Sequence, residues 1–329
     1  MSTAAVLAAA AGFAVFLCGM KLLEIALFRA AGQGLHRALE RFTETPVRGL
    51  MAGSAASALL QSSTAVTVIT IGLANTGLLS RGRTLGIILG TNIGTCLTTE
   101  LLGLPIASLA APLAAVSAAV WALTVLVMEY RPSLAPGPPG ASGSRPLLPA
   151  VHFGAAALFG FAMLLKGISL MTSVGPAVQD SPIFDWFLAR SGSGPLWGIA
   201  AGAVLTAAVH SSSAVIGLVM GLSASGALPP ETGVAAVLGA NIGTCFTAVA
   251  AALPGTPAGR FVALAHLLLN LAGALLFAPF TAQLYALAGA LGDPEPAARI
   301  AHAQTLFNVG CSLLALPLCY LPVWRRNGG

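Results

Sequence analysis

Charged residues are scarce in this sequence. Only 8% of its 329 residues are Asp, Glu, Lys or Arg, against about 25% in ordinary soluble domains, while 57% are apolar. This composition excludes a domain that is solvated by water on all sides. Apolar runs of about 20 residues recur along the chain, and each is long enough to span a hydrocarbon core of about 30 Å. They are too numerous for a signal peptide followed by a soluble domain, so we predict an all-α polytopic membrane protein.

Patterns typical of disulfides and metal sites are also lacking. The cysteines show no C-x-x-C pair and no histidine-spaced pattern, and all five lie in apolar runs, where cysteine behaves as a small hydrophobe: Cys18, Cys96, Cys245, Cys311 and Cys319. We expect no disulfide, no resident metal and no cofactor. The basic residues behind the net charge of +5 lie in short loops beside apolar spans, where they indicate orientation in a lipid bilayer rather than nucleic-acid binding.

One internal repeat dominates the sequence. The segment LLQSSTAVTVITIGLANTGLLS (59–80) is matched by AVHSSSAVIGLVMGLSASGALP (208–229). Ser62 and Ser211 stand 149 positions apart, as do Asn92 and Asn241, and the aligned block covers about 50 residues without a gap. A repeat of this length predicts a repeated architecture.

Each repeat is predicted to hold three spans and one re-entrant hairpin. The segments with the polar clusters, 47–79 and 195–228, would each measure about 50 Å as one helix, which is too long for the bilayer core. Folded back at the polar cluster, each becomes two half-length helices that reach the midplane. The spans are expected at 4–28, 84–103 and 105–129 in the first repeat, at 150–174, 232–253 and 258–286 in the second, and at 299–323 in a final helix.

Charge predicts the orientation of the two hairpins. Both flanks of the first are basic, which places them together in the cytoplasm: Arg29, Arg37, Arg41 and Arg48 before it, Arg81 and Arg83 after it. The second is flanked by Asp180, Asp185 and Glu231 with Arg190 as the only cation, so we expect it to open outward. Three spans per repeat then force the two copies into inverted topology, with the N terminus outside and the C terminus in the cytoplasm.

The predicted organisation has four parts. They are inverted repeat 1 at 1–130, a cytoplasmic linker at 131–149, which includes the Pro-, Gly- and Ser-rich run 133–146, inverted repeat 2 at 150–286, and a C-terminal transmembrane helix and tail at 287–329. Within the loop 175–194, the motif FDWF indicates an interfacial helix with Trp186 at the headgroup level. No soluble domain is expected after the last helix, so the predicted protein consists of the membrane-embedded core alone. We expect it in a cell membrane, the inner membrane of a bacterium.

The polar clusters at the two breaks are the first candidate site. Irregular backbone at membrane depth is tolerated only where it is buried in protein or lines a watery cavity. Opposed hairpins would bring the clusters together near the midplane, where helix N-termini and hydroxyls surround an anion without a fixed cation. This is a transporter design. The residues concerned are Gln61, Ser62, Ser63 and Thr64 in the first cluster, and His210, Ser211, Ser212 and Ser213 in the second.

A second polar pair follows each hairpin at Asn92 and Thr95 and at Asn241 and Thr244. The glycines around each asparagine are expected to let another backbone approach closely and to weaken the helix locally: Gly90 and Gly94, and Gly239 and Gly243. Amide, hydroxyl and freed carbonyl oxygens suit sodium, and the lack of carboxylates argues against a divalent ion.

Several residues have a structural alternative to a functional role. His210 stands in the second repeat at the position of Gln61 in the first. It either donates the same hydrogen bond as Gln61 or has a proton-linked role. Lys21, Glu24 and Lys166 are ionisable groups within spans and so candidates for function, with snorkelling or a structural pair as the favoured interpretation. We assign Asn270, His266, His302 and Asn308 to contacts between helices, and place Glu100 near the outer face.

At these residues the sequence resembles a known family. QSSTA and HSSSA, each followed by NIGT 31 positions after its first residue, are similar to the duplicated QSSS signature of type II sodium-phosphate cotransporters, over roughly residues 10–320. The resemblance implies phosphate contacts at Gln61, Ser62, Ser63, Thr64, Ser211, Ser212 and Ser213, and sodium contacts at Ser63, Thr64, Ser212 and Ser213 beside Asn92, Thr95, Asn241 and Thr244. His210, which joins the phosphate set, departs from the family glutamine.

The predicted function is therefore secondary active transport, namely sodium-coupled uptake of inorganic phosphate by alternating access, and not an enzyme. A passive anion channel is one rival. An intramembrane Ser/His enzyme is the other, because His210 adjoins Ser211, but no third orienting group and no G-x-S-x-G motif accompany them. Phosphate against related oxyanions, the number of sodium ions and a homodimer are left open by the sequence.

Overall fold

A computed structural model describes residues 3–31, 34–130, 147–192, 194–292 and 295–325, and all the regular structure in these ranges is helical. Most of the predicted linker lies outside them. The first half contains α1 (Thr3–Ala31), α2 (Gly34–Phe42), α3 (Pro46–Leu60), α4 (Ser63–Asn75), α5 (Arg81–Gly103), η1 (Ala107–Leu109) and α6 (Ala110–Tyr130). The second contains α7 (Leu147–Ser173), α8 (Gly175–Gln179), α9 (Pro182–Ser191), α10 (Pro195–Val209), α11 (Ser212–Ala224), α12 (Pro230–Ala252), α13 (Pro257–Phe277), η3 (Ala278–Phe280), α14 (Thr281–Gly289), α15 (Pro296–Ala315), η4 (Leu316–Tyr320) and η5 (Pro322–Arg325).

Seven helical segments of the described chain are long and apolar enough to cross a membrane, the number predicted from the sequence. They are Val6–Ala31, Arg81–Gly103, Ala107–Tyr130, Leu147–Ser173, Pro230–Ala252, Pro257–Gly289 and Pro296–Tyr320. The helix predicted in the loop 175–194 is also present, as α9. The apolar helices α4, α10 and α11 are too short for a full crossing.

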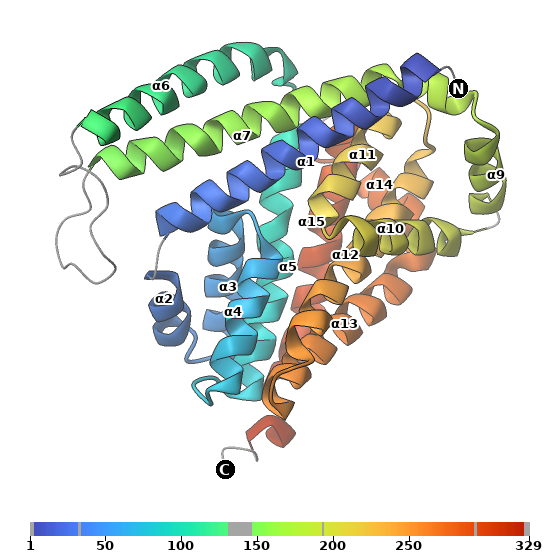
Figure 1. The fold of residues 1–329 in the computed structure, drawn as a ribbon. Coiled ribbons are helices and arrows are strands. Elements are labelled where there is room, and N and C mark those ends of the chain that lie inside the picture. Colours follow the sequence, from blue (N-terminus) through green and yellow to red (C-terminus); the bar gives the residue numbers. More distant parts are fainter. Residues whose placement is uncertain (1–2, 32–33, 131–146, 193, 293–294, 326–329) are drawn as a thin grey trace.

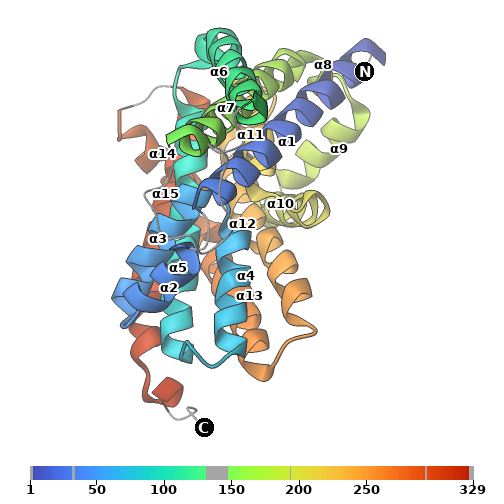
Figure 2. The same cartoon turned by 60° about the vertical axis from the view of Figure 1, so that its left-hand side comes forward.

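The helix boundaries recur at the spacing of the sequence repeat. Helices α3, α4 and α5 begin and end 149 positions before α10, α11 and α12, respectively. The two breaks, between α3 and α4 and between α10 and α11, therefore fall at equivalent residues. Figures 1 and 2 show α1, α6 and α7 crossing obliquely over one end of the molecule, with η5 at the other end.

Glycines bring several helices into close contact. A Cβ at Gly90 would overlap the Leu50 carbonyl of α3, and one at Gly239 would overlap the Ile199 carbonyl of α10. The expected close approach is therefore observed in both copies. The expected local weakening is not, because α5 and α12 continue as α-helices through Asn92 and Asn241. Their carbonyl oxygens remain engaged in the helix, and none is freed there for a cation.

Helices α1 and α7 pack against each other. Gly12 of α1 lies against Gly167 of α7, while Gly19 lies against Gly160. Since the contact moves backward along α7 as it moves forward along α1, the two helices run antiparallel. A small residue at each crossing point permits this approach of backbone to backbone.

Candidate functional site

The two helix breaks have the same backbone geometry. Gln61 and His210 adopt left-handed conformations, with φ of 54° and 59°, and they are the only non-glycine residues with positive φ in the described chain. This conformation costs about 1–2 kcal/mol for a residue with a Cβ. Ser62 and Ser211 follow in extended conformation, and their hydroxyl oxygens accept hydrogen bonds from Ala65 N at 3.2 Å and Ala214 N at 3.3 Å. Each serine thus caps the outgoing helix.

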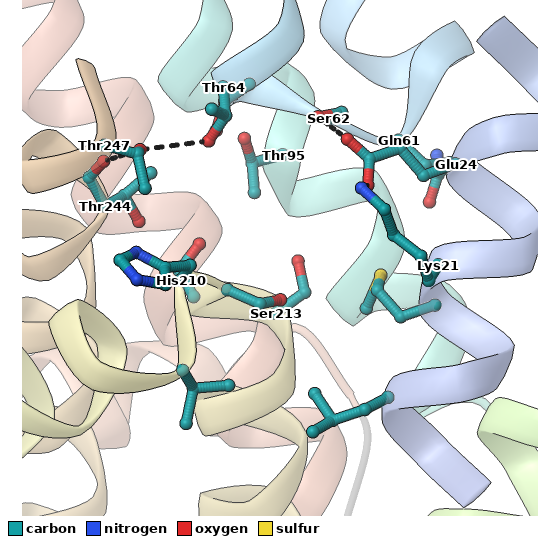
Figure 3. Close-up of a pocket in the computed structure, with 16 residues that line it drawn as sticks. Lys21, Glu24, Gln61, Ser62, Thr64, Thr95, His210, Ser213, Thr244 and Thr247 are labelled. Carbon is teal, nitrogen blue, oxygen red and sulfur yellow. Dashed lines mark hydrogen bonds and ion pairs between the residues drawn. The ribbon is translucent and has the colours of Figure 1, made fainter. Parts of the chain in front are cut away.

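Both breaks face a single cavity of about 470 Å³. Figure 3 shows residues of the first break on one side of it and His210 with Ser213 on the other. The structure brings all eight residues of the two polar clusters together. The lining consists of Leu17, Met20, Lys21, Glu24, Gln61, Ser62, Ser63, Thr64, Thr95, Val209, His210, Ser211, Ser212, Ser213, Thr244 and Thr247.

The predicted sodium residues divide into two groups. Thr95 and Thr244 line the cavity together with the four from the breaks (Ser63, Thr64, Ser212, Ser213). Asn92 does not line it, because its amide donates to Asn270 Oδ1 at 3.1 Å and its carbonyl oxygen lies 3.3 Å from His266 Nε2. Asn241 also turns away and donates to the Val237 carbonyl at 2.9 Å. Asn92 therefore links α5 to α13, while Asn241 bonds within its own helix α12, and neither lines the cavity.

The four polar residues of α13 and α15 that we assign to contacts between helices bond to residues of α5. Asn270 and His266 of α13 bond to Asn92 of α5, as expected. His302 Nδ1 lies 2.7 Å from the Glu100 carboxylate, and Asn308 Nδ2 donates to Cys96 Sγ at 3.3 Å. The expected inter-helix role is confirmed for all four residues (Asn270, His266, His302 and Asn308).

A charged pair on α1 faces the cavity, which corrects the expectation of a site without a fixed cation. Lys21 Nζ lies 2.9 Å from Glu24 Oε2, and the Ser62 hydroxyl donates to Glu24 Oε1 at 2.6 Å (Figure 3). The sequence marked both residues as ionisable groups inside a span, but it could not place them beside the first break. Lys166, the lysine within α7, is exposed and is not part of the lining.

Two threonines that sequence analysis did not select support the breaks. Thr98 donates to Gln61 Oε1 at 2.6 Å, and its equivalent Thr247 lies with its hydroxyl 3.5 Å from that of Thr64. Their spacing of 149 positions is a signal that the repeat already contained. His210 does not make the hydrogen bond expected of a residue in place of Gln61, because its side chain is exposed and no hydrogen bond of its ring is found among the described residues.

The electrostatics of the cavity favour a bound anion. Helices α4 and α11 both begin at its wall, and the first N–H groups of a helix carry partial positive charge and lack partners within the helix. Hydroxyls from both breaks add further donors, and Lys21 adds an ammonium group whose charge is offset by the paired carboxylate of Glu24. No group of three or more His, Cys, Asp or Glu that would suit a metal ion is found in the described part of the chain.

Comparison with known proteins gives the site its context. The sequence model of the Na+/Pi-cotransporter family matches residues 15–131 and 163–291. "Uncharacterized protein YqeW" of Bacillus subtilis (strain 168) is 32% identical over 312 residues, which cover 93% of this chain and 92% of that protein. No solved structure matches the chain significantly.

A second relative is longer. "Putative inorganic phosphate export protein YjbB" of Escherichia coli (strain K12) is 26% identical over 305 residues, which cover 92% of this chain. The match covers 52% of YjbB, so this chain spans about half the length of that relative. Since the family model covers most of the chain in two stretches, on either side of the segment between the repeats, this multi-pass membrane protein belongs to the Na+/Pi-cotransporter family.

Proposed function

We propose that the protein is a secondary active transporter that couples uptake of inorganic phosphate to sodium by alternating access, with phosphate held between the two helix breaks. One observation carries the proposal: two breaks of identical backbone geometry, each with a serine-capped helix N-terminus, face one cavity in a member of this family. Helix N-termini and hydroxyls bind phosphate oxygens by their donors. Discontinuous helices between repeats are a recurring design for such sites.

The repeats are proposed to have inverted topology, with α3–α4 and α10–α11 as re-entrant hairpins. The antiparallel packing of α1 and α7 supports inversion, because these helices open the two copies. Seven candidate spans, an odd number, agree with an outside N terminus and a cytoplasmic C terminus. The boundaries then remain those of the sequence: repeats at 1–130 and 150–286, a linker at 131–149 and a C-terminal part at 287–329.

The site is proposed to use both breaks. Phosphate would contact the backbone N–H groups that begin α4 and α11 together with the polar side chains of both clusters. Sodium would take hydroxyl oxygens, which suit a hard monovalent cation, from Ser63, Thr64, Thr95, Ser212, Ser213 and Thr244. Asn92 and Asn241, which face away, drop out of this proposed sodium set.

Flux into proteoliposomes tests the function directly. The purified full chain is reconstituted, and radiolabelled phosphate is followed under an inward sodium gradient and under an equal potassium gradient. A sodium-coupled transporter accumulates phosphate above its equilibrium level only with sodium. Flux that only equilibrates would indicate a channel, and equal uptake in the two salts would refute coupling to sodium. Reversing the gradient tests export, the activity in the name of YjbB.

A cross-link tests the motion. The Thr64 and Thr247 hydroxyls lie 3.5 Å apart, so cysteines at both positions, in a chain whose native cysteines are replaced by alanine, should form a disulfide. We expect oxidation to abolish phosphate uptake and a reductant to restore it. Each single cysteine variant is the control. Full uptake by the oxidised double variant would exclude movement of α4 against α12 from the transport cycle.

A further inference from the structure

The ion pair on α1 consists of one positive and one negative side chain, which are the counter-charges of the two ions that the proposed function requires. Among the described residues that line the cavity, only Lys21, Glu24 and His210 carry a titratable side chain. Lys21 and Glu24 face the cavity in contact with each other, at 2.9 Å. The Lys21 side chain remains 68% exposed and that of Glu24 25% exposed, so an ion in the cavity has access to both.

The same pair engages the groups that an anion would need. The Glu24 carboxylate accepts a hydrogen bond from Ser62, the cap of α4, and an ionic hydrogen bond from Lys21. An oxyanion at the start of α4 would seek these same two donors, a hydroxyl and an ammonium group. In this arrangement, the carboxylate occupies donors that a phosphate oxygen requires.

If Lys21 leaves the pair, the Glu24 carboxylate, whose side chain is only 25% exposed, loses its opposite charge in a partly desolvated site, which has a cost. The cost on the side of Lys21 is smaller, because that side chain is 68% exposed. If an anion takes Lys21, Glu24 requires a new cation. If a sodium ion takes Glu24, Lys21 becomes available to an anion. Each ion therefore lowers the cost of binding the other, which is a reciprocal coupling between two sites.

We propose that Lys21 and Glu24 couple the two ions by exchange of partners: phosphate takes the ammonium group of Lys21, sodium takes the carboxylate of Glu24, and the pair re-forms when both have left. This inference rests on the proposed function. It adds two residues of α1 to the binding site and assigns them the sodium dependence of phosphate binding.

The test is the ratio of the phosphate KM at low sodium to that at high sodium, at constant ionic strength, in proteoliposomes. Allosteric couplings commonly amount to about 5-fold or more, and we expect such a ratio in the unmodified chain. In Glu24→Gln the ratio should approach 1 and the KM at low sodium should fall, because no carboxylate holds Lys21. In Lys21→Gln the ratio should also approach 1, with a raised phosphate KM and half-maximal rate at lower sodium.

A matched control lies outside the cavity. Glu44 pairs with Arg48 at the start of α3, and both side chains are more than 60% exposed, so Glu44→Gln should keep the ratio of the unmodified chain. A ratio unchanged in Glu24→Gln and in Lys21→Gln, with normal sodium-driven uptake in the unmodified chain, overturns the exchange and leaves the proposed function intact. Absence of sodium-driven uptake in the unmodified chain overturns both. Should Glu24→Gln fail to fold, Lys21→Gln alone decides, because its side chain is largely exposed.

Discussion

The break between α3 and α4 and the break between α10 and α11 share a backbone but differ in their side-chain partners. At the first, Gln61 accepts from Thr98 and donates to the Ala58 carbonyl, and Ser62 bonds to Glu24. At the second, the exposed His210 ring has no hydrogen bond among the described residues, and Ser211 has its cap bond. The first break is thus held by side chains and the second mainly by its backbone, so we expect the second to be displaced more easily.

Substitutions at the glycine contacts that the two copies share should have the largest effects on the free energy of unfolding. Gly90→Ala and Gly239→Ala each place a methyl group against a backbone carbonyl of the facing helix, and overpacking of this kind typically costs about 1–3 kcal/mol. We expect similar losses of unfolding free energy for the two variants, measured by SDS titration in mixed micelles.

Gly72→Ala is the control for these glycines, because a Cβ there would meet no atom within 4 Å. Alanine in a helix interior is favoured over glycine by about 1 kcal/mol, so this variant should be stabilised. A large loss in one copy alone would show that the two helix pairs are not equivalent in energy.

Substituting the capping serine should destabilise the first copy more than the second. Loss of an N-cap costs about 1 kcal/mol, which we expect for Ser211→Ala. Ser62→Ala also removes the donor to the Glu24 carboxylate, and we expect about 1 kcal/mol more. The same titration measures both, while proteoliposome uptake should show a raised phosphate KM in each. Equal losses of stability would mean that the bond to Glu24 contributes nothing.

Exchanging the residue types at the two left-handed positions, Gln61 and His210, tests which side-chain bonds stabilise each break. Gln61→His removes the acceptor of Thr98 and should cost about 1 kcal/mol. His210→Gln should gain roughly 0.5–1 kcal/mol if the new amide bonds to Thr247, the equivalent of Thr98. Adding Thr247→Val should cancel that gain in a double-mutant cycle. If His210→Gln is neutral, the different partners of the breaks do not originate at this residue.

The repeat explains why so much of the fold was predictable. The polar cluster, repeated at one offset, predicted both breaks, and the length of the apolar runs predicted the seven helical segments that are long enough to cross a membrane. The direction in which a side chain points was harder to predict, because it depends on how each helix is rotated. In α5, the small residues Gly86, Gly90 and Gly94 pack on α3, and this contact leaves Asn92 facing α13.

The position of the charged pair in the cavity could not be predicted for a similar reason. The crossing of α1 with α7 at Gly12 and Gly19 sets the rotation of α1, and that rotation places Lys21 and Glu24 beside the first break. Composition and periodicity identify such residues as unusual in a span, but they do not contain the angle at which two distant helices cross. The hydrogen bond of Ser62 to Glu24, 38 positions away, likewise depends on tertiary packing.

The smallest effect is expected at the C-terminal end of α4, away from the breaks. Asn75 Oδ1 accepts from Thr256 N, Thr256 Oγ1 and Gly259 N at 2.7–3.1 Å, and so caps the start of α13. Its equivalent in the second copy, Ala224, has no such group. These bonds are largely exposed, so Asn75→Ala should cost only about 0.5–1 kcal/mol, with faster hydrogen exchange confined to the first turn of α13.

Thr76→Val is the matched control for Asn75, because its hydroxyl bonds only to carbonyls of its own helix, those of Gly72 and Leu73. It should leave exchange in α13 unchanged. If Asn75→Ala has no effect on α13 either, this contact does not distinguish α4 from α11, and the expected difference between the two copies has to arise at the breaks. If it accelerates exchange in α13, Asn75 ties the end of α4 to the start of α13, a hydrogen-bonded contact that α11 lacks at Ala224.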